Sequence, residues 1–179
     1  MRSIAVAALV LFLASLAFAV EPVTATHGTI TKIDKVAKTV AIKTADGTEH
    51  VFHWTKDTAV HGAQATGAAA EDSWHGLKEG SEVVAHSTKR GTEDTALEID
   101  NVGDKGLNKT EGTVKEFDRG SKKLVVETAD GTEHTFQLSS HAAADAGKDI
   151  GAETKKGTKV VVYSTEASGK KVAHFFEKI

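Results

Sequence analysis

Apolar and polar residues alternate along many short segments of this chain, which is the pattern of half-buried β-strands. The alternation predicts five strands in the first half, at about residues 28–34, 38–44, 48–54, 81–87 and 95–102. It predicts five more in the second half, at about residues 112–118, 122–128, 132–138, 158–164 and 171–178. We therefore expect an all-β protein.

The second half of the chain repeats the first. The seven residues Thr44–His50 return letter for letter at Thr128–His134, 84 positions further on. This duplication predicts two units, residues 27–103 and residues 111–179, joined by a short polar linker at residues 104–110. Units of this size bury little apolar surface on their own, so we expect the two to pack on each other.

Each copy of the heptapeptide contains Ala-Asp-Gly between two strand segments, which is a hairpin signal. A two-residue Asp46-Gly47 loop would place the apolar residues of the two strands on different faces. A three-residue loop that begins at Ala45 pairs Val40 with Phe52 and gathers the apolar residues on one face. The pattern favours this longer loop, with Gly47, and likewise Gly131 in the second copy, at a positive φ.

Each unit contains a three-stranded meander, a longer connection and a final hairpin, which is the order of a small Greek-key barrel. We expect two tandem five-stranded OB-like Greek-key barrels, each with a short helix or long loop after its third strand. The two connections hold alanine-rich patches at Ala68–Ala70 and Ala142–Ala144, which favour short helices there.

The first nineteen residues predict a cleavable secretory signal, because Arg2 precedes an apolar run from Ile4 to Leu13, and Ala17-Phe18-Ala19 follows ahead of Val20. We expect a periplasmic or secreted protein without a membrane anchor after cleavage. The chain has no cysteine, which excludes disulfides, thiolate metal sites and cysteine nucleophiles.

The formal net charge is −3, and no basic stripe follows the chain, so we expect no nucleic-acid partner. No phosphate loop, nucleophile elbow or metalloprotease motif is present, so we do not expect an enzyme. The leading hypothesis is a non-catalytic, exported binding module without a cofactor. Its partner would be an unknown envelope or extracellular protein or a small ligand.

The alternative hypothesis is that the chain binds a metal ion through histidines, because six of the nine histidines lie between His27 and His86. His50 and His53 point to opposite faces of one strand and do not share an ion. OB connectivity brings His27, His50 and His86 towards one rim, and three imidazoles suit Zn²⁺ or Cu²⁺. This predicts a soluble periplasmic metal-binding protein that uses the first unit. The competing interpretation is that the three histidines are rim residues, hydrogen-bonded or solvated.

Two tryptophans are candidates for an aromatic platform. Trp54 is in phase with Phe52, which favours a place in the core. Trp74 and His75 lie in the long connection, which favours exposure and makes them a candidate ligand loop.

The glycine and hairpin positions carry a resemblance. The runs Gly28–Asp34 and Gly112–Asp118, the repeated Asp-Gly-Thr and the element Leu77–Gly80 resemble small secreted bacterial β-barrel domains of unknown function, which often occur in tandem. This resemblance implies the same fold and no particular activity.

A second resemblance is to the small periplasmic copper chaperones of cation-efflux systems, which are single OB barrels with the same glycine, Ile/Val and Ile-Asp order. Those proteins use His, Met and a Trp packed over the metal. His50 and Trp54 lie in the corresponding region. The only methionine is Met1, so the thioether ligands have no counterpart in the chain after signal cleavage.

Overall fold

The computed structural model describes residues 22–63, 74–145 and 154–179. The expected signal segment, residues 1–19, and the patch Ala68–Ala70 lie outside the described residues. No helix in the described part of the chain is long and apolar enough to cross a membrane.

The first unit is a barrel whose strands are antiparallel except for two parallel pairings with β6. Its strands pair in the order β3-β2-β1-β5-β6-β4, and β3 also pairs in parallel with β6, which closes the strands β3-β2-β1-β5-β6 into a ring. The short strand β4 pairs in parallel with β6 as well. The strands are β1 Thr24–Asp34, β2 Thr39–Lys43, β3 Glu49–His53, β4 Ala59–His61, β5 Glu82–Arg90 and β6 Glu93–Asn101.

The second unit repeats this plan as a closed barrel in the order β10-β11-β9-β8-β7. Its elements are β7 Asn108–Asp118, β8 Lys123–Glu127, β9 Glu133–Leu138, α2 Ser140–Ala144, β10 Lys159–Ala167 and β11 Lys170–Lys178. The short helix follows the third strand, as the alanine-rich patch predicts. The all-β prediction of two five-stranded barrels is confirmed, and the three-residue strand β4 is an addition to it.

Both repeated hairpins have the three-residue loop. Val40 faces Phe52 across β2 and β3, and Leu124 faces Phe136 across β8 and β9. Gly47 has a φ of 87° and Gly131 a φ of 84°, a backbone conformation that disfavours any residue with a Cβ. The alternation of side chains therefore determines the register of both hairpins, as predicted.

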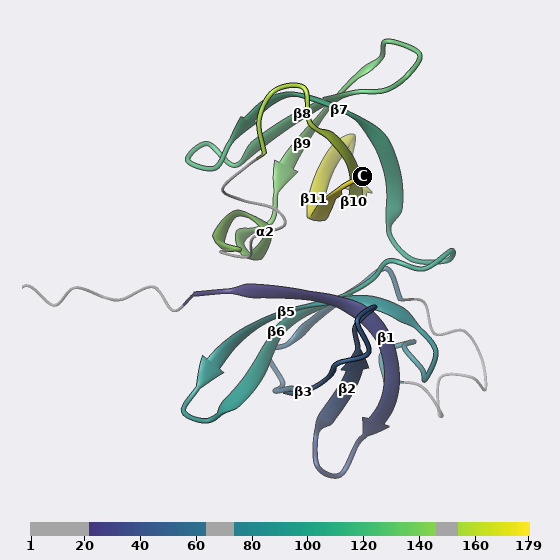
Figure 1. The fold of residues 1–179 in the computed structure, drawn as a ribbon, viewed down its shortest axis with the longest axis vertical. Helices are drawn as coiled ribbons and strands as arrows, with labels where there is room; N and C mark the ends of the chain where they lie inside the picture. The colour runs from purple at the N-terminus through teal and green to yellow at the C-terminus, as the bar shows by residue number, and fades with distance from the viewer. Residues whose placement is uncertain (1–21, 64–73, 146–153) are drawn as a thin grey trace, which may run out of the picture.

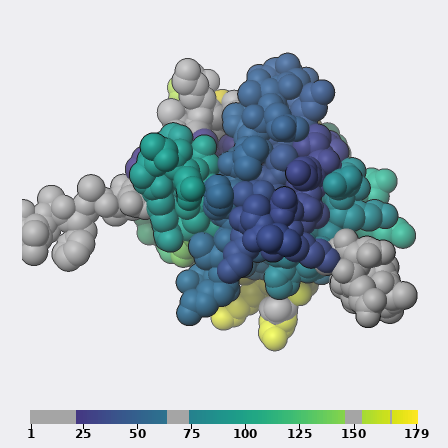
Figure 2. Space-filling model, turned by 90° about the horizontal axis from the view of Figure 1, so that it is seen from below, coloured from purple at the N-terminus to yellow at the C-terminus, as the bar shows by residue number. Residues whose placement is uncertain are grey.

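The two barrels pack against each other, and Figure 1 shows β1 and α2 at the junction between them. Val23 forms a parallel bridge with Asp145, and the amide of Ala25 donates to Asp145 Oδ1 at 3.2 Å. Figure 2, which views the molecule from below, shows the opposite face of the first barrel, formed mainly by its early strands.

Two hydrophobic clusters form the cores. One fills the first barrel around Ile30, Phe52 and Ile99. The other fills the second barrel and continues across the junction to Val84 and Leu107, which belong to the first half of the chain. The duplicated units thus share buried surface, which supplies what each lacks alone.

Two expectations need correction. β7 begins at Asn108, inside the segment expected to be linker, because its first residues pair with β10 near Ser164. Trp74 is only 8% exposed, because a bridge to Leu77 turns it onto Trp54, with ring centroids 4.3 Å apart. His75 is exposed and has a φ of 50°. The aromatic pair belongs to the first barrel's core.

Candidate metal centre

Two carboxylates of β6 lie at the junction between the barrels. Ile99 points into the first barrel and is fully buried, so its neighbours Glu98 and Asp100 point outwards. The second barrel covers them, leaving Glu98 3% and Asp100 0% exposed. Burial of two carboxylates is costly unless cations or hydrogen bonds compensate their charge.

The first barrel supplies two histidines beside these carboxylates. His61 on β4 is paired in register with Asp100, and His86 on β5 is paired with Glu98, so all four side chains share the outer face. His61 Nδ1 lies 3.0 Å from Asp100 Oδ1 and 3.3 Å from Glu98 Oε1. Strand pairing alone thus gathers these four groups.

The second barrel supplies His174 through a β-bulge. Tyr163 pairs with Phe175 and Ser164 with Ala173, which leaves His174 as an extra residue on β11. Its Nδ1 lies 2.6 Å from Glu98 Oε1 and 3.8 Å from Asp100 Oδ1. A bulge re-aims a side chain that a regular strand would direct elsewhere, and here it directs an imidazole at β6.

The helix α2 supplies a fourth histidine. Ser139 caps this helix by accepting a hydrogen bond from the amide of Ala142, which fixes its first turn at the junction. His141 Nδ1 donates to Glu98 Oε2 at 2.5 Å. Glu98 therefore has histidines at both of its oxygens.

Four of these groups form a donor set suited to a metal ion. One ligand atom each from His61, Glu98, Asp100 and His174 lies within 4.8 Å of the other three. A tetrahedral ion with bonds of about 2.0 Å holds its ligand atoms about 3.3 Å apart. The four nitrogen-to-oxygen distances between these side chains run from 2.6 to 3.8 Å and bracket that value.

Groups behind the donor set hold it in place. His141 binds the second oxygen of Glu98, and Thr165 Oγ1 lies 3.0 Å from the second ring nitrogen of His174. Such outer contacts orient the ligands of metal sites and select the histidine tautomer. The arrangement fits a preformed centre with protein ligands on all sides.

The electrostatics of the centre favour an ionised Glu98. Burial raises the pKa of Glu98, but hydrogen bonds from His141, His174 and His61 outweigh it and hold the pKa well below its usual range. Hydrogen bonds to Asp100 and Glu98 raise the pKa of His61 to about 10. Burial opposes protonation of His86, and the nearby Asp100 reverses the balance and raises its pKa. Without a metal, protons supply the compensating positive charge.

The three histidines expected at a rim are placed differently from one another. His27 lies between Glu82 and Glu177, 3.2 Å from each. His50 stacks on Phe52 with ring centroids 6.2 Å apart, and His86 lies beside Asp100. None of the three belongs to the four-residue donor set, although His86 borders it. Ligation at the rim by all three remains a prediction.

Five residues of the centre and its surroundings were not expected from the sequence: His61, Glu98, Asp100, His141 and His174. One signal for them exists in the run Leu97-Glu98-Ile99-Asp100, whose alternation places two acids on one face of a strand. Two acids on one face of a strand ordinarily indicate that this face is exposed to solvent. Here the second barrel covers the face and buries both acids.

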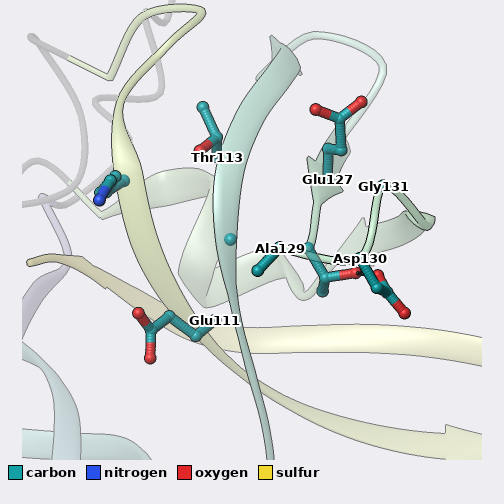
Figure 3. A pocket seen from close by; sticks show the side chains of 9 residues that line it. Glu111, Thr113, Glu127, Ala129, Asp130 and Gly131 are labelled. Carbon is teal, nitrogen blue, oxygen red and sulfur yellow. Dashed lines mark hydrogen bonds between the residues drawn. The ribbon is translucent and has the colours of Figure 1, made fainter.

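A groove of about 750 Å³ in the second barrel lies between β7 and the β8–β9 hairpin, with residues that line it shown in Figure 3. The carboxylates of Glu111, Glu127 and Asp130 point in different directions there and do not converge on one point. The equivalent groove of the first barrel is about 380 Å³ and includes Lys43 where the second has Glu127. The two grooves therefore differ in charge, and neither offers a metal donor set.

No protein-family model and no curated protein matches the chain. Solved structures with some similarity include silver-bound CusF, at 17% identity and a TM-score of 0.33, covering 44% of this chain and 96% of that chain. Apo-CusF from Escherichia coli has 17% identity and a TM-score of 0.35, covering 50% and 98%. The drosophila Unr CSD456 structure has 12% identity and a TM-score of 0.37, covering 87% and 61%. Similarities at this level carry no weight for the site, whose chemistry rests on the residues of this chain.

Proposed function

We propose that this chain is an exported, non-catalytic protein that binds a divalent transition-metal ion, Zn²⁺ or Cu²⁺, at His61, Glu98, Asp100 and His174. The observation that carries the proposal is the approach of four ligand atoms to within 4.8 Å of one another at the buried junction. The metal-binding part follows the alternative drawn from the histidine content, with a ligand set that spans both barrels.

The chemistry of the donors favours these ions. Two imidazole nitrogens and two carboxylate oxygens suit borderline divalent ions, whereas Cu⁺ and Ag⁺ prefer thiolate and thioether sulfur. The chain has no cysteine, and its single methionine is Met1. Mg²⁺ and Ca²⁺ prefer all-oxygen sites, so the two imidazoles select against them.

The non-catalytic part of the proposal rests on the number of protein ligands. Catalytic zinc sites have three protein ligands and keep a position open for water or substrate, whereas sites with four protein ligands are closed. Here four side chains surround one centre, and two of them are at most 3% exposed. A closed site stores, carries or uses the ion structurally.

Metal titration of the purified full chain tests the proposal. After treatment with EDTA and dialysis at pH 7, isothermal titration calorimetry with Zn²⁺ or Cu²⁺ should show binding with a Kd below about 1 μM. His174→Ala should weaken binding at least tenfold, because it removes the ligand that the second barrel contributes.

His27→Ala is the matched control, since His27 also lies between carboxylates at the junction but outside the donor set. It should leave the affinity within about twofold of the wild type. Equal loss in both variants, or no binding by the wild type, would contradict the proposed site.

A further inference from the structure

His86 has a fully buried side chain, and neither of its ring nitrogens has a hydrogen-bond partner among the described residues. Its Nε2 faces Asp100 Oδ2 across 3.4 Å, and that oxygen is likewise buried without a hydrogen bond. Leaving such groups unsatisfied costs about 1–3 kcal/mol each. A pair of unsatisfied groups that face each other is the arrangement expected where a ligand binds between them.

In the second barrel, the equivalent pair of residues is hydrogen-bonded, so the fold does not require unsatisfied groups at these positions. Tyr163 and Glu177 occupy the positions equivalent to His86 and Asp100, 77 residues further along the chain. The Tyr163 hydroxyl donates to Glu177 Oε1 at 2.9 Å, and Glu177 Oε2 lies 3.2 Å from a ring nitrogen of His27. The same two positions are thus satisfied by side chains in one repeat and unsatisfied in the other.

Glu98 and Asp100 each have one oxygen directed at one pair of histidines and the other oxygen directed at a second pair. Glu98 Oε1 and Asp100 Oδ1 face the pair His61 and His174. The second oxygens face other histidines, since Glu98 Oε2 lies 2.5 Å from His141 and Asp100 Oδ2 lies 3.4 Å from His86. Two bridging carboxylates with a histidine pair on either side form the donor arrangement of a two-metal site.

The two rings of the second histidine pair must move closer together to share an ion. The ring centroids of His86 and His141 are 6.3 Å apart. Two imidazoles bound tetrahedrally to one ion have centroids about 5.1 Å apart when metal-to-nitrogen bonds are near 2.0 Å. Binding therefore requires the rings to approach each other by about 1 Å, and the His141 side chain, 31% exposed, has room to move.

Charge favours a cation at this place as well. Asp145 is fully buried at this side of the junction, and its negative charge acts on His86. The same charge attracts a divalent ion placed beside His86.

We propose that a second divalent ion binds between His86 and His141, coordinated by Asp100 Oδ2 and Glu98 Oε2, so that the two carboxylates bridge a pair of ions. The inference rests on the proposed function, because the first ion of the pair is the one at His61 and His174. Ions bridged in this way lie about 3.5–4 Å apart.

Stoichiometry tests the second ion. The full chain, freed of metal with EDTA, is loaded with Cu²⁺ or Zn²⁺ and dialysed, and the bound metal is measured by plasma mass spectrometry. The wild type should retain two ions per chain. His86→Gln and His141→Gln should each retain one, and His27→Gln should retain two.

Electron paramagnetic resonance detects coupling between neighbouring Cu²⁺ ions. A purely structural role for His86 would not produce this coupling. One equivalent of Cu²⁺ should give the spectrum of an isolated ion, and a second equivalent should broaden or abolish it through coupling between neighbouring ions. In both glutamine variants the second equivalent should add only the signal of free Cu²⁺.

The outcomes separate this inference from the proposed function. One ion per wild-type chain, with an unchanged content in His86→Gln and His141→Gln, overturns the second site and leaves the first standing. No ion in the wild type overturns both. The use of two variants guards against misfolding, because the His141 side chain is 31% exposed whereas that of His86 is buried.

Discussion

Glu98 and His174 lie 76 positions apart in the chain and in different barrels, yet Glu98 Oε1 and His174 Nδ1 are 2.6 Å apart in a buried contact. The barrels therefore meet through a polar centre as well as through apolar packing. Any cation at this centre holds ligands from both halves of the chain, so occupancy and the docking of the barrels are thermodynamically linked.

Metal should stabilise the whole chain against heat. An ion that binds only the folded, docked state contributes about 2.7 kcal/mol at a concentration one hundred times its Kd. For a chain of this size that corresponds to a rise in Tm of roughly 5–10 °C. Differential scanning calorimetry with Zn²⁺ and then with excess EDTA measures the rise and its reversal. An unchanged Tm at saturating Zn²⁺ is the contrary result.

Replacing Glu98 should destabilise the metal-free protein. Glu98→Gln removes the negative charge that accepts hydrogen bonds from His61, His141 and His174, and leaves the positive charge of His61 less compensated. Breaking a buried ion pair on one side costs about 3–5 kcal/mol. Urea unfolding in EDTA measures this loss.

Glu93→Gln is the control on the same strand. The Glu93 side chain is 60% exposed and lies 3.7 Å from His53. Exposed pairs contribute about 0–1 kcal/mol, so this variant should unfold close to the wild type. Equal losses in the two variants would show that the burial of Glu98 has no energetic consequence.

His27 should make the junction sensitive to pH independently of metal. A hydrogen bond to Glu177 raises the pKa of His27 above 6.5, against the opposing effect of burial. Because the folded-state pKa is the higher one, its stabilisation is fully present below pH 6.5 and declines as the pH rises through the folded-state value. Unfolding of wild type and His27→Gln in EDTA should differ more at pH 5.5 than at pH 8.5. A difference that stays constant over this range contradicts the prediction.

Gly28 should not tolerate a side chain. A Cβ at this position would lie 2.4 Å from the carbonyl oxygen of Lys43, a backbone atom that cannot swing away. Overpacking of this kind costs about 1–3 kcal/mol, so Gly28→Ala should lower the urea midpoint. The neighbouring Thr29 is exposed, and Thr29→Ala should change stability by no more than about 0.5 kcal/mol. Similar midpoints for the two variants would contradict this close approach.

The sequence alone determined the features that depend on neighbouring residues in the chain, namely the register of the hairpins and the order of the strands. The side-chain period of a strand is two residues, so the alternation around Val40 and Phe52 was enough to set the hairpin register. The positive φ at Gly47 and Gly131 follows from the same loop length. The element order then led to two small barrels, because a meander followed by a hairpin closes in few ways.

The candidate centre depended on contacts that no local rule contains. Glu98 and Asp100 stand on the outer face of β6, where alternation predicts solvent, and only the second barrel buries them. His174 reaches them because a bulge adds one residue to β11, and His61 because β4 pairs with β6. A sequence records which residues face outwards from a strand, but whether an outer face meets water or another barrel is decided by the packing of the complete chain.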